Sequence, residues 1–388
     1  MWYYIRMIER KLAVRMKELA STYSVLTLVG PRQSGKTTLS KMVFPQHAYV
    51  NLESLTEREF AISDPIAFIR RYDGQSVIID EVQRVPNLLS QIQVEVDANP
   101  APGRFILTGS QNFSMMQTVT QSLAGRTALC TLFPFALGEV RDKIAGQSLD
   151  ETLWRGFYPK LYAQALNPAD ELAFYVSTYL ERDVREIENV RNLRAFSVVL
   201  RLAAGRTGQV LNVSSLAGDA GISPKVASDW LSLLESSYIV KLVEPWSANI
   251  NKRLVKAPKL YFLDVGLACS LLGISSFEQL QAHPLRGALF ETMVVDEFLK
   301  TRENAVGHYA INYYRDSNRN EIDLVIGDGG RVMLYEVKSG ATFSPDWLAT
   351  MRRLSSQFGS DTRLNVVYGG DTSQERTEFK LWSWRDLP

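Results

Sequence analysis

The chain has 388 residues, of which 46% are hydrophobic and 22% charged, a composition typical of soluble globular proteins. This length exceeds what one core of ordinary size accommodates, so two or three domains are expected. The formal net charge of +1 excludes a strongly basic, histone-like protein, and any contact with nucleic acid would depend on local basic patches.

Targeting and redox features point to the cytoplasm. No uninterrupted apolar run approaches the roughly 18 to 20 residues of a membrane helix, so no membrane partner is expected. Residues 1–6 do not begin a signal peptide, because no charged region followed by an apolar stretch is present. Cys130 and Cys269 are too few for a disulfide framework or a zinc cluster.

The first motif, from Gly30 to Thr37, ends a short apolar run at residues 24–30 that suits a buried parallel strand. It fits G-x-x-x-x-G-K-[ST] without a mismatch, and a helix is expected to start near Lys36. Such a loop predicts ATP or ADP as ligand, with Lys36 reaching the β- and γ-phosphates and Thr37 ligating Mg²⁺. The predicted nucleotide-binding residues of this loop are Gly30, Pro31, Arg32, Gln33, Ser34, Gly35, Lys36, Thr37 and Thr38.

A second apolar strand, residues 76–81, ends in Asp80 and Glu81. At the carboxyl edge of a parallel sheet, Asp80 would lie beside Mg²⁺ and contribute to its site, and Glu81 would orient and polarise the attacking water. A third strand, residues 104–111, is expected between this strand and the phosphate loop. Ser110 or Gln111 could sense the γ-phosphate there, with Thr108 an equal candidate and a simple turn an open alternative.

Residues 208–245 predict a helix, a turn, a second helix and a strand, and residues 260–263 predict the partner strand, which together give the pattern of a winged helix. The second helix has an apolar stripe and an exposed side that is too acidic for a convincing major-groove reader. The segment between the strands is basic and could contact phosphates, which makes DNA an expected partner. Use of this part as a packing module stays an equal alternative. The apolar stripe comprises Val226, Trp230, Leu233 and Leu234. The exposed side of the second helix carries Lys225, Ser228, Asp229, Ser232 and Glu235. The basic segment between the strands contains Lys252, Arg253, Lys256 and Lys259.

Two strands near the C-terminus, residues 321–326 and 331–338, flank a glycine-rich turn and predict a hairpin. If Ile326 lies opposite Arg331, Asp323 lies opposite Leu334 and diagonal to Glu336, on the face that also carries Lys338. A register slip of an even number of residues would preserve this face. Two carboxylates and a lysine on one face suit a Mg²⁺-dependent nuclease, with Asp323 and Glu336 as metal ligands and Lys338 assisting the water.

Taken together, the phosphate loop, the Asp80–Glu81 pair and several short motifs resemble a family of AAA+-like ATPases of bacteria and archaea. The resemblance covers nearly the whole chain and implies a winged-helix segment and a C-terminal nuclease-like domain. It also implies an arginine that stabilises transition-state charge, and Arg126 and Arg182 both lie in family motifs. An arginine acting from another copy would require a homo-oligomer, and the sequence leaves the assembly open. The other matching motifs are Thr108-Gly109-Ser110, residues 123–126, Phe133-Pro134-Phe135, Tyr158-Pro159 and residues 179–184.

The C-terminal residues resemble the PD-(D/E)XK nuclease family, in which a glutamate comes from an N-terminal helix. Such a helix is expected from residue 287 to 300, and its periodicity does not choose between Glu291 and Glu297. The resemblance selects Glu291 as a catalytic acid beside Asp323 and Glu336. The alternative is a surface ion pair on a fold that only binds.

The predicted fold class is α/β, with four segments. A P-loop NTPase parallel-sheet domain spans residues 1–140, a helical lid or spacer 141–205, a winged helix 206–285 and a restriction-endonuclease-like α/β domain 286–388. Two functions remain: an ATPase that acts on DNA, or a nucleotide-dependent switch whose nuclease-like domain only binds a partner or nucleic acid.

Overall fold

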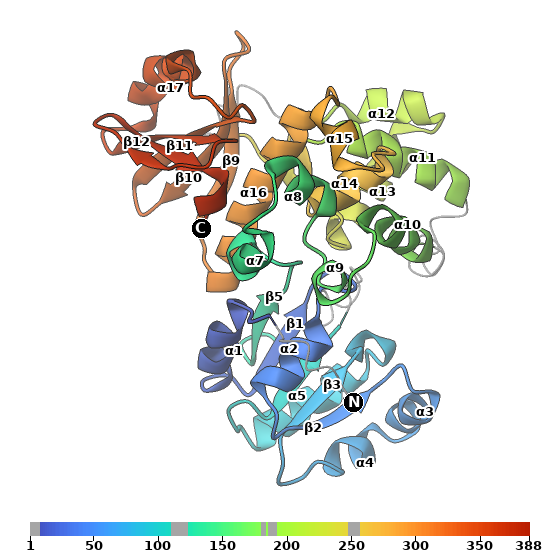
Figure 1. The fold of residues 1–388 in the computed structure, drawn as a ribbon. Helices are drawn as coiled ribbons and strands as arrows, with labels where there is room; N and C mark the ends of the chain where they lie inside the picture. The colour runs from blue at the N-terminus through green and yellow to red at the C-terminus, as the bar shows by residue number, and fades with distance from the viewer. Residues whose placement is uncertain (1–7, 110–122, 180–183, 185–191, 247–256) are drawn as a thin grey trace. The chain divides into compact units, whose positions relative to one another are not determined.

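A computed structural model describes residues 8–109, 123–179, 184, 192–246 and 257–388. The chain forms two compact units (Figure 1). The first comprises Met1–Phe135, Ser236–Tyr238 and Arg302–Gly307, and the second Ala136–Glu235, Ile239–Thr301 and His308–Pro388. The boundaries predicted at 205/206 and 285/286 stay predictions, since residues on both sides of each belong to the second unit. Within the described residues, no helix combines the length and the apolar character needed to cross a membrane.

The first unit contains a parallel five-stranded sheet, and all of the strands predicted near the phosphate-loop motif are present. The order is β2-β3-β4-β1-β5, so β4 lies between the strand that ends in Asp80 and the strand that leads into the loop, as predicted. The carboxyl ends of β1, β3 and β4 therefore share one edge. The strands are β1 Val25–Val29, β2 Ala48–Asn51, β3 Val77–Asp80, β4 Phe105–Thr108 and β5 Thr127–Thr131.

Helices cover both faces of this sheet, which explains why its central strands are buried along their whole length and mostly apolar rather than alternating. Leu26, Leu28 and Ile106 pack on one face against α1 (Leu12–Ala20) and α2 (Lys36–Val43). Apolar residues of the opposite strand faces pack against the remaining helices. These are α3 Leu55–Ser63, α4 Pro65–Arg70, the 3-10 turn η1 Val82–Arg84 and α5 Leu88–Ala98.

In the second unit, two glycines allow a loop after α8 to contact the start of α14. A Cβ on Gly156 would lie 2.5 Å from Asp264 Oδ1, and one on Gly266 would lie 2.7 Å from the Gly156 Cα. Asp264 accepts hydrogen bonds there from the Phe157 and Leu267 amides. Helices of this part are α7 Leu137–Ile144, α8 Leu149–Arg155, α9 Lys160–Ala163, α10 Pro168–Tyr179, α14 Val265–Leu271 and α15 Phe277–Gln281.

The predicted helix, turn, helix and two strands within residues 208–245 and 260–263 are present as α12, α13, β7 and β8. Strands β7 and β8 pair antiparallel, and a short β6 adds to β8. The buried stripe of α13 is rotated from the predicted one: Ala227 and Leu231 are buried with Trp230 and Leu234, whereas Val226 and Leu233 are half-buried. The elements are α11 Leu193–Ala204, β6 Gln209–Val210, α12 Val213–Ala220, α13 Pro224–Ser236, β7 Val240–Val243 and β8 Lys259–Phe262.

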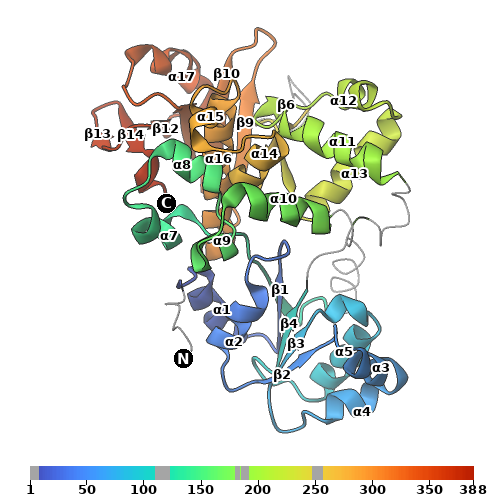
Figure 2. The same cartoon turned by 45° about the vertical axis from the view of Figure 1, so that its right-hand side comes forward.

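The C-terminal part is a mixed six-stranded sheet of order β13-β14-β12-β11-β10-β9. Within the second unit it lies to one side of α16 (Arg286–Ala305), with α11 to α13 to the other (Figures 1 and 2). The remaining elements are β9 Ala310–Arg315, β10 Glu321–Asp328, β11 Arg331–Lys338, η4 Pro345–Leu348, α17 Ala349–Leu354, η5 Ser355–Phe358, β12 Thr362–Tyr368, β13 Gln374–Glu375, β14 Phe379–Ser383 and η6 Trp384–Asp386.

The predicted hairpin of β10 and β11 exists, but its predicted register was wrong by two residues. Ile326 lies opposite Met333 rather than Arg331, because the turn contains only Gly329 and Gly330 and pairing extends to Asp328 and Arg331. The slip is even, so the carboxylates stay on one face, and Asp323 falls beside Glu336 rather than diagonal to it. A bulge between Ile322 and Val325 on the β9 side interrupts the ladder around Asp323.

Candidate functional site

The phosphate loop has the backbone that an anion-binding loop requires. Gly30 has φ +146°, and a Cβ there would lie 2.2 Å from the Leu132 carbonyl oxygen, so only glycine fits. Gln33 and Gly35 also have positive φ values, of 60° and 94°. When right-handed and left-handed backbone conformations follow one another, successive N–H groups point into one concavity. Such a concavity binds phosphate oxygens favourably.

Two polar side chains lie within this loop. The Lys36 side chain is buried, and its Nζ donates to the Gly30 and Pro31 carbonyls at 2.9 and 2.8 Å. The buried Ser34 Oγ has no hydrogen-bond partner among the described residues. A buried hydroxyl without a partner is costly, and a phosphate oxygen bound in the loop would provide one. Of the other predicted loop residues, Pro31 is buried, Arg32 is half-buried, and Gln33 and Thr38 are exposed.

Asp80 is the centre of a hydroxyl network at the carboxyl edge of the sheet. Its Oδ2 accepts from Thr37 Oγ1 at 2.8 Å and from the Tyr49 hydroxyl at 2.9 Å. Thr108 donates to Oδ1. Burial, followed by the hydrogen bond to Asp80, raises the pKa of Tyr49, which stays a donor. Ser110 and Gln111 lie outside the described residues.

Glu81 follows β3 in a left-handed conformation, with φ 58° and ψ 42°. Non-glycine residues adopt this region rarely, and the strain is found most often at functional positions. Gln83 donates a hydrogen bond to Glu81 Oε2. The backbone thus turns directly after Asp80, so the two adjacent acids point in different directions and have different neighbours.

Arg10 is a residue of this site that the sequence pattern did not reveal. Its guanidinium is buried and donates to the Ser34 carbonyl at 2.9 Å and to the Phe133 carbonyl at 2.6 Å. It also lies 4.7 Å from the centroid of the Phe135 ring. Arg10 therefore ties the phosphate loop to the segment after β5, which places Phe133-Pro134-Phe135 next to the loop.

The two predicted arginines have different outcomes. Arg126 pairs with Asp97 at the end of α5, with a 2.5 Å contact from Nε; Arg126 is half-buried and Asp97 is exposed. The Arg126 carbonyl accepts from the Val25 amide, so Arg126 lies at the amino ends of the parallel strands β1 and β5. The phosphate loop follows the opposite, carboxyl end of β1. Arg126 therefore cannot reach the nucleotide site of its own chain. Arg182 lies outside the described residues.

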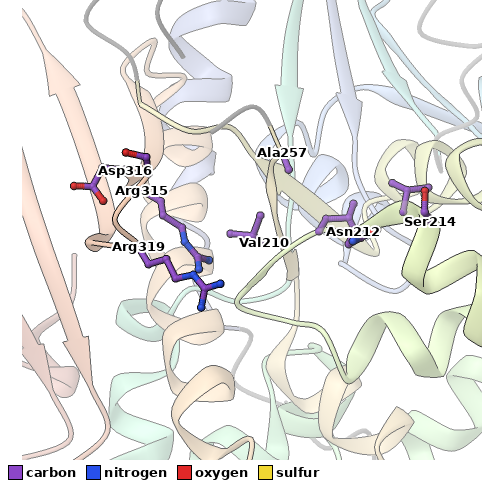
Figure 3. A pocket seen from close by; sticks show the side chains of 10 residues that line it. Val210, Asn212, Ser214, Ala257, Arg315, Asp316 and Arg319 are labelled. Atoms are coloured by element: carbon purple, nitrogen blue, oxygen red, sulfur yellow. The ribbon is translucent and has the colours of Figure 1, made fainter. Parts of the chain in front are cut away.

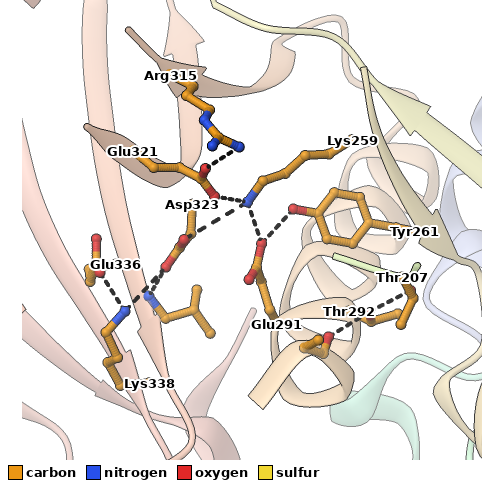
Figure 4. A network of polar contacts seen from close by, with 12 residues as sticks. Thr207, Lys259, Tyr261, Glu291, Thr292, Arg315, Glu321, Asp323, Glu336 and Lys338 are labelled. Atoms are coloured by element: carbon orange, nitrogen blue, oxygen red, sulfur yellow. Dashed lines mark hydrogen bonds and ion pairs between the residues drawn. The ribbon is translucent and has the colours of Figure 1, made fainter. Parts of the chain in front are cut away.

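In the second unit, the structure brings Asp323, Glu336 and Lys338 together on the hairpin (Figure 4). Lys338 Nζ lies 2.5 Å from Glu336 Oε1 and 3.9 Å from Asp323 Oδ2. Asp323 Oδ2 also accepts from the Val337 amide at 2.8 Å. Glu336 Oε2 is buried without a hydrogen-bond partner among the described residues.

Glu291 of α16 faces the same cluster (Figure 4). Glu291 Oε1 accepts from the Tyr261 hydroxyl at 2.6 Å. Glu297 is fully buried elsewhere, where it accepts from the Leu137 amide and pairs with Lys300. Of the two glutamates, Glu291 therefore lies in the cluster with Asp323, and its catalytic role stays a prediction.

A lysine that the sequence assigned to a DNA-contacting segment occupies this cluster. Lys259 of β8 is 1% exposed, and its Nζ lies 2.9 Å from Glu291 Oε1, 2.5 Å from Glu321 Oε1 and 4.0 Å from Asp323 Oδ1. Burial opposes the charge of this ammonium, but the neighbouring carboxylates, Glu291 first, outweigh burial and raise its pKa. The interpretation of Lys259 as a phosphate-contacting residue was wrong, because its side chain is directed inward from the strand.

Burial dominates the protonation of the two glutamates beside Asp323. Burial first, and the charge of Asp323 second, raise the pKa of Glu291 to about 7 and that of Glu336 to about 7. The structure therefore stabilises these carboxyls in their neutral form more than water does.

The surface predicted to contact DNA is described in part. Lys225, Ser228, Asp229 and Ser232 are exposed on α13, as expected. Glu235 is half-buried instead, where it pairs with Lys241 at 2.7 Å and accepts from the Leu242 amide. The acidic character of this face is therefore weaker than predicted. Lys252, Arg253 and Lys256 lie outside the described residues.

A groove of about 620 Å³ lies where the start of α12 meets the turn between β9 and β10 (Figure 3). The side chains of Arg315 and Arg319 extend from that turn toward Val210. Asn212, the N-cap of α12, and Ser214 line the opposite side, together with the backbone of the helix start. The groove combines two cations with amide and hydroxyl groups, and Asp316 lies at its edge.

Known families cover most of the chain. Residues 22–141 match the family described as an AAA domain, and residues 146–278 and 286–387 match two domains of unknown function (DUF8612 and DUF4143). An AAA-like ATPase domain of the P-loop type thus forms the N-terminal part, as the resemblance predicted. The winged-helix and nuclease-like identities of the later parts stay predictions.

Relatives and solved structures extend these matches. The uncharacterized proteins Rv2008c of Mycobacterium tuberculosis and Mb2031c of Mycobacterium bovis are each 30% identical over 375 residues, covering 94% of this chain and 81% of theirs. The Walker-type ATPase PABY2304 of Pyrococcus abyssi is 14% identical with a TM-score of 0.47, covering 68% of this chain and 96% of that chain. NtrX from Brucella abortus, in complex with ATP, is 14% identical with a TM-score of 0.26, covering 57% and 66%.

Proposed function

The chain belongs to the family of the mycobacterial proteins Rv2008c and Mb2031c, and we propose that it binds Mg²⁺–ATP in its phosphate loop and hydrolyses it. The observation that carries this proposal is the joint placement of Lys36, Ser34 and Asp80. The Lys36 ammonium lies inside a glycine-defined loop with the buried Ser34 hydroxyl, which has no hydrogen-bond partner among the described residues, and the Asp80 carboxylate lies 2.8 Å from the Thr37 hydroxyl.

The residues present fit a magnesium ion at this edge. Thr37 Oγ1 and Asp80 Oδ2 are oxygen groups of the kind that Mg²⁺ prefers, and the ion would offset phosphate charge when bound. Thr108 and Tyr49 hold the orientation of the Asp80 carboxylate through their hydroxyls. Glu81, turned away from Asp80 by its left-handed backbone, would orient the attacking water.

ATP turnover by purified protein tests this proposal. Lys36→Ala should reduce turnover at least about 100-fold, because one preorganised charge-stabilising donor is lost. Lys17→Ala, an exposed lysine of α1, is the matched control and should keep the wild-type rate. Equal turnover by wild type and Lys36→Ala would contradict the proposal.

DNA is the partner proposed for the second unit. The order of α11, β6, α12, α13, β7 and β8 is that of a winged helix, which supports this proposal. The groove beside α12 adds a second support, because Arg315 and Arg319 provide charge that suits a phosphate backbone.

Binding of labelled duplex DNA at several salt concentrations, with and without ATP, tests this part. Arg319→Ala should weaken DNA binding, and the slope of the logarithm of the binding constant against the logarithm of salt concentration should fall by about one, as loss of a phosphate contact predicts. Arg363→Ala, an arginine of β12 that pairs with Asp361, is the control. Identical binding by both variants would exclude the groove as the contact. ATP turnover without any DNA binding would favour a nucleotide-dependent switch that acts on another partner.

A further inference from the structure

Lys259 occupies an unusual position for a lysine. A lysine side chain is almost never fully buried unless it is paired, and Lys259 is 1% exposed with carboxylates on several sides. Its strand, β8, belongs to the three-stranded sheet, whereas the acids come from α16 and β10. The ammonium therefore joins two parts of the second unit through charge.

The space that a metal ion would need holds this ammonium. A Mg²⁺ ion requires several oxygen ligands at about 2.0–2.1 Å. Between Glu291 and Asp323 lies Lys259 Nζ, within 4.0 Å of both carboxylates. On the other side of Asp323, Oδ2 is engaged by the Val337 amide and faces Lys338. Across the described residues, no group of three or more His, Cys, Asp or Glu side chains is arranged to hold a metal ion.

The net charge of the acid cluster also disfavours a divalent metal ion. Three basic groups face four carboxyls, so one formal negative charge remains when all are ionised. A divalent cation would therefore meet little net attraction while the lysines are present. The basic groups are Lys259, Lys338 and Arg315, and the acids are Glu291, Glu321, Asp323 and Glu336.

We propose that Lys259 is a built-in cation that takes the place of a divalent metal in this acid cluster, so that the wild-type chain binds no metal there and does not cleave DNA with these acids. The inference goes beyond the proposed function, because ATP hydrolysis in the first unit neither requires nor excludes it. The residues that resemble a nuclease site serve, in this chain, to hold β8 against α16 and the β10–β11 hairpin.

Removal of the ammonium should uncover the metal site. The test measures Mn²⁺ binding by electron paramagnetic resonance without nucleotide, in a parent that carries Thr37→Ala to remove the phosphate-loop ligand. The parent should show no Mn²⁺ binding that depends on Asp323. Adding Lys259→Met should tighten Mn²⁺ binding at least tenfold, and adding Asp323→Asn as well should abolish that gain. Lys241→Met, on the neighbouring strand β7, is the matched control and should not differ from the parent.

Two outcomes would overturn the proposal. One is Mn²⁺ binding by the parent that is lost in Asp323→Asn; the other is a Lys259→Met variant with a wild-type circular dichroism spectrum and no gain in Mn²⁺ affinity. If Lys259→Met does not fold, wild type and Asp323→Asn still decide the matter through cleavage of labelled linear and four-way-junction DNA in Mn²⁺. Absence of cleavage by both supports the proposal, and cleavage lost only in Asp323→Asn refutes it. Because this readout needs no ATP, its failure is distinct from failure of the ATPase proposal.

Discussion

The phosphate-loop site and the acid cluster both place carboxylates at strands of a sheet, yet their charges are neutralised differently. Asp80 accepts hydrogen bonds from neutral hydroxyls, and Lys36 donates to neutral carbonyls. Asp323 and Glu291, by contrast, face ammonium groups of the same chain. The printed hydrogen-bond donors to Asp80 are thus neutral, whereas Asp323 and Glu291 are paired with cations of the same chain.

This difference shows why acidic motifs of similar appearance have different capacities. Mg²⁺ competes easily with a neutral hydroxyl, because the hydroxyl can remain as a further oxygen ligand. A buried ammonium cannot become a ligand, and its displacement would leave a charge without a partner in a region of low dielectric constant. Four substitutions test this comparison, beginning with the largest expected effect.

Glu81→Gln should separate nucleotide binding from hydrolysis. ATP affinity should stay within a few-fold of wild type, while kcat falls about 100- to 10,000-fold, because the group that orients and polarises water loses its charge. Single-turnover kinetics measure both quantities. Glu18→Gln on the exposed side of α1 is the control. If Glu81→Gln turned ATP over at the wild-type rate, another group would have to orient the attacking water.

Lys259→Met should lower the free energy of unfolding of the second unit by about 3–5 kcal/mol, because it leaves buried carboxylates without their cation. Combining it with Glu291→Gln should recover part of this loss. Lys241→Met removes a half-exposed pair and should cost less than about 1 kcal/mol. Urea denaturation followed by tryptophan fluorescence compares the variants. Equal losses for both lysines would show that the buried cluster contributes no more than a surface pair.

Arg10→Met should raise the KM for ATP about tenfold, which corresponds to 1.4 kcal/mol and to one charge-assisted hydrogen bond. The Ser34 carbonyl would lose its anchor, and the loop would become less well positioned for phosphate. Steady-state kinetics measure the change, and Arg10→Lys should restore little, since a lysine cannot span both carbonyls. An unchanged KM would mean that the loop keeps its shape without Arg10.

Arg126→Ala should have the smallest effect, with little change in the free energy of unfolding, because its pair with Asp97 lies near the surface, where solvent screens it. Its position excludes action on the nucleotide of its own chain. Any loss of ATP turnover should therefore appear only at protein concentrations at which copies associate, as measured by turnover over a dilution series. A loss that persists in dilute monomer would contradict this placement.

Several features could be predicted from the sequence because they depend on neighbours in the chain. The loop from Gly30 to Thr37 and the strand ending at Asp80 follow from spacing and apolar runs, and both are present. The hairpin was predicted with a register two residues away from the observed one, since its turn is shorter than the glycine-rich segment suggested. The shared face of Asp323 and Glu336 survived that error because side chains alternate with a period of two.

Other features depended on contacts between distant segments. Lys259 lies in a basic stretch of the sequence, which predicts an exposed surface, but β8 directs it between Glu291 and Glu321. Arg10 and Tyr49 belong to no motif, and they reach the nucleotide site from segments far from the loop.

By itself the sequence determined an AAA-like domain with a complete phosphate loop and the presence of acids on one face of the C-terminal hairpin. Only the tertiary structure decided which carboxylates accept hydrogen bonds from neutral hydroxyls, as Asp80 does, and which are paired with a cation of the same chain, as Asp323 is. The physical reason is that a backbone loop is specified by local dihedral preferences, whereas the charge that a carboxylate presents depends on every cation that folding brings within a few ångströms of it.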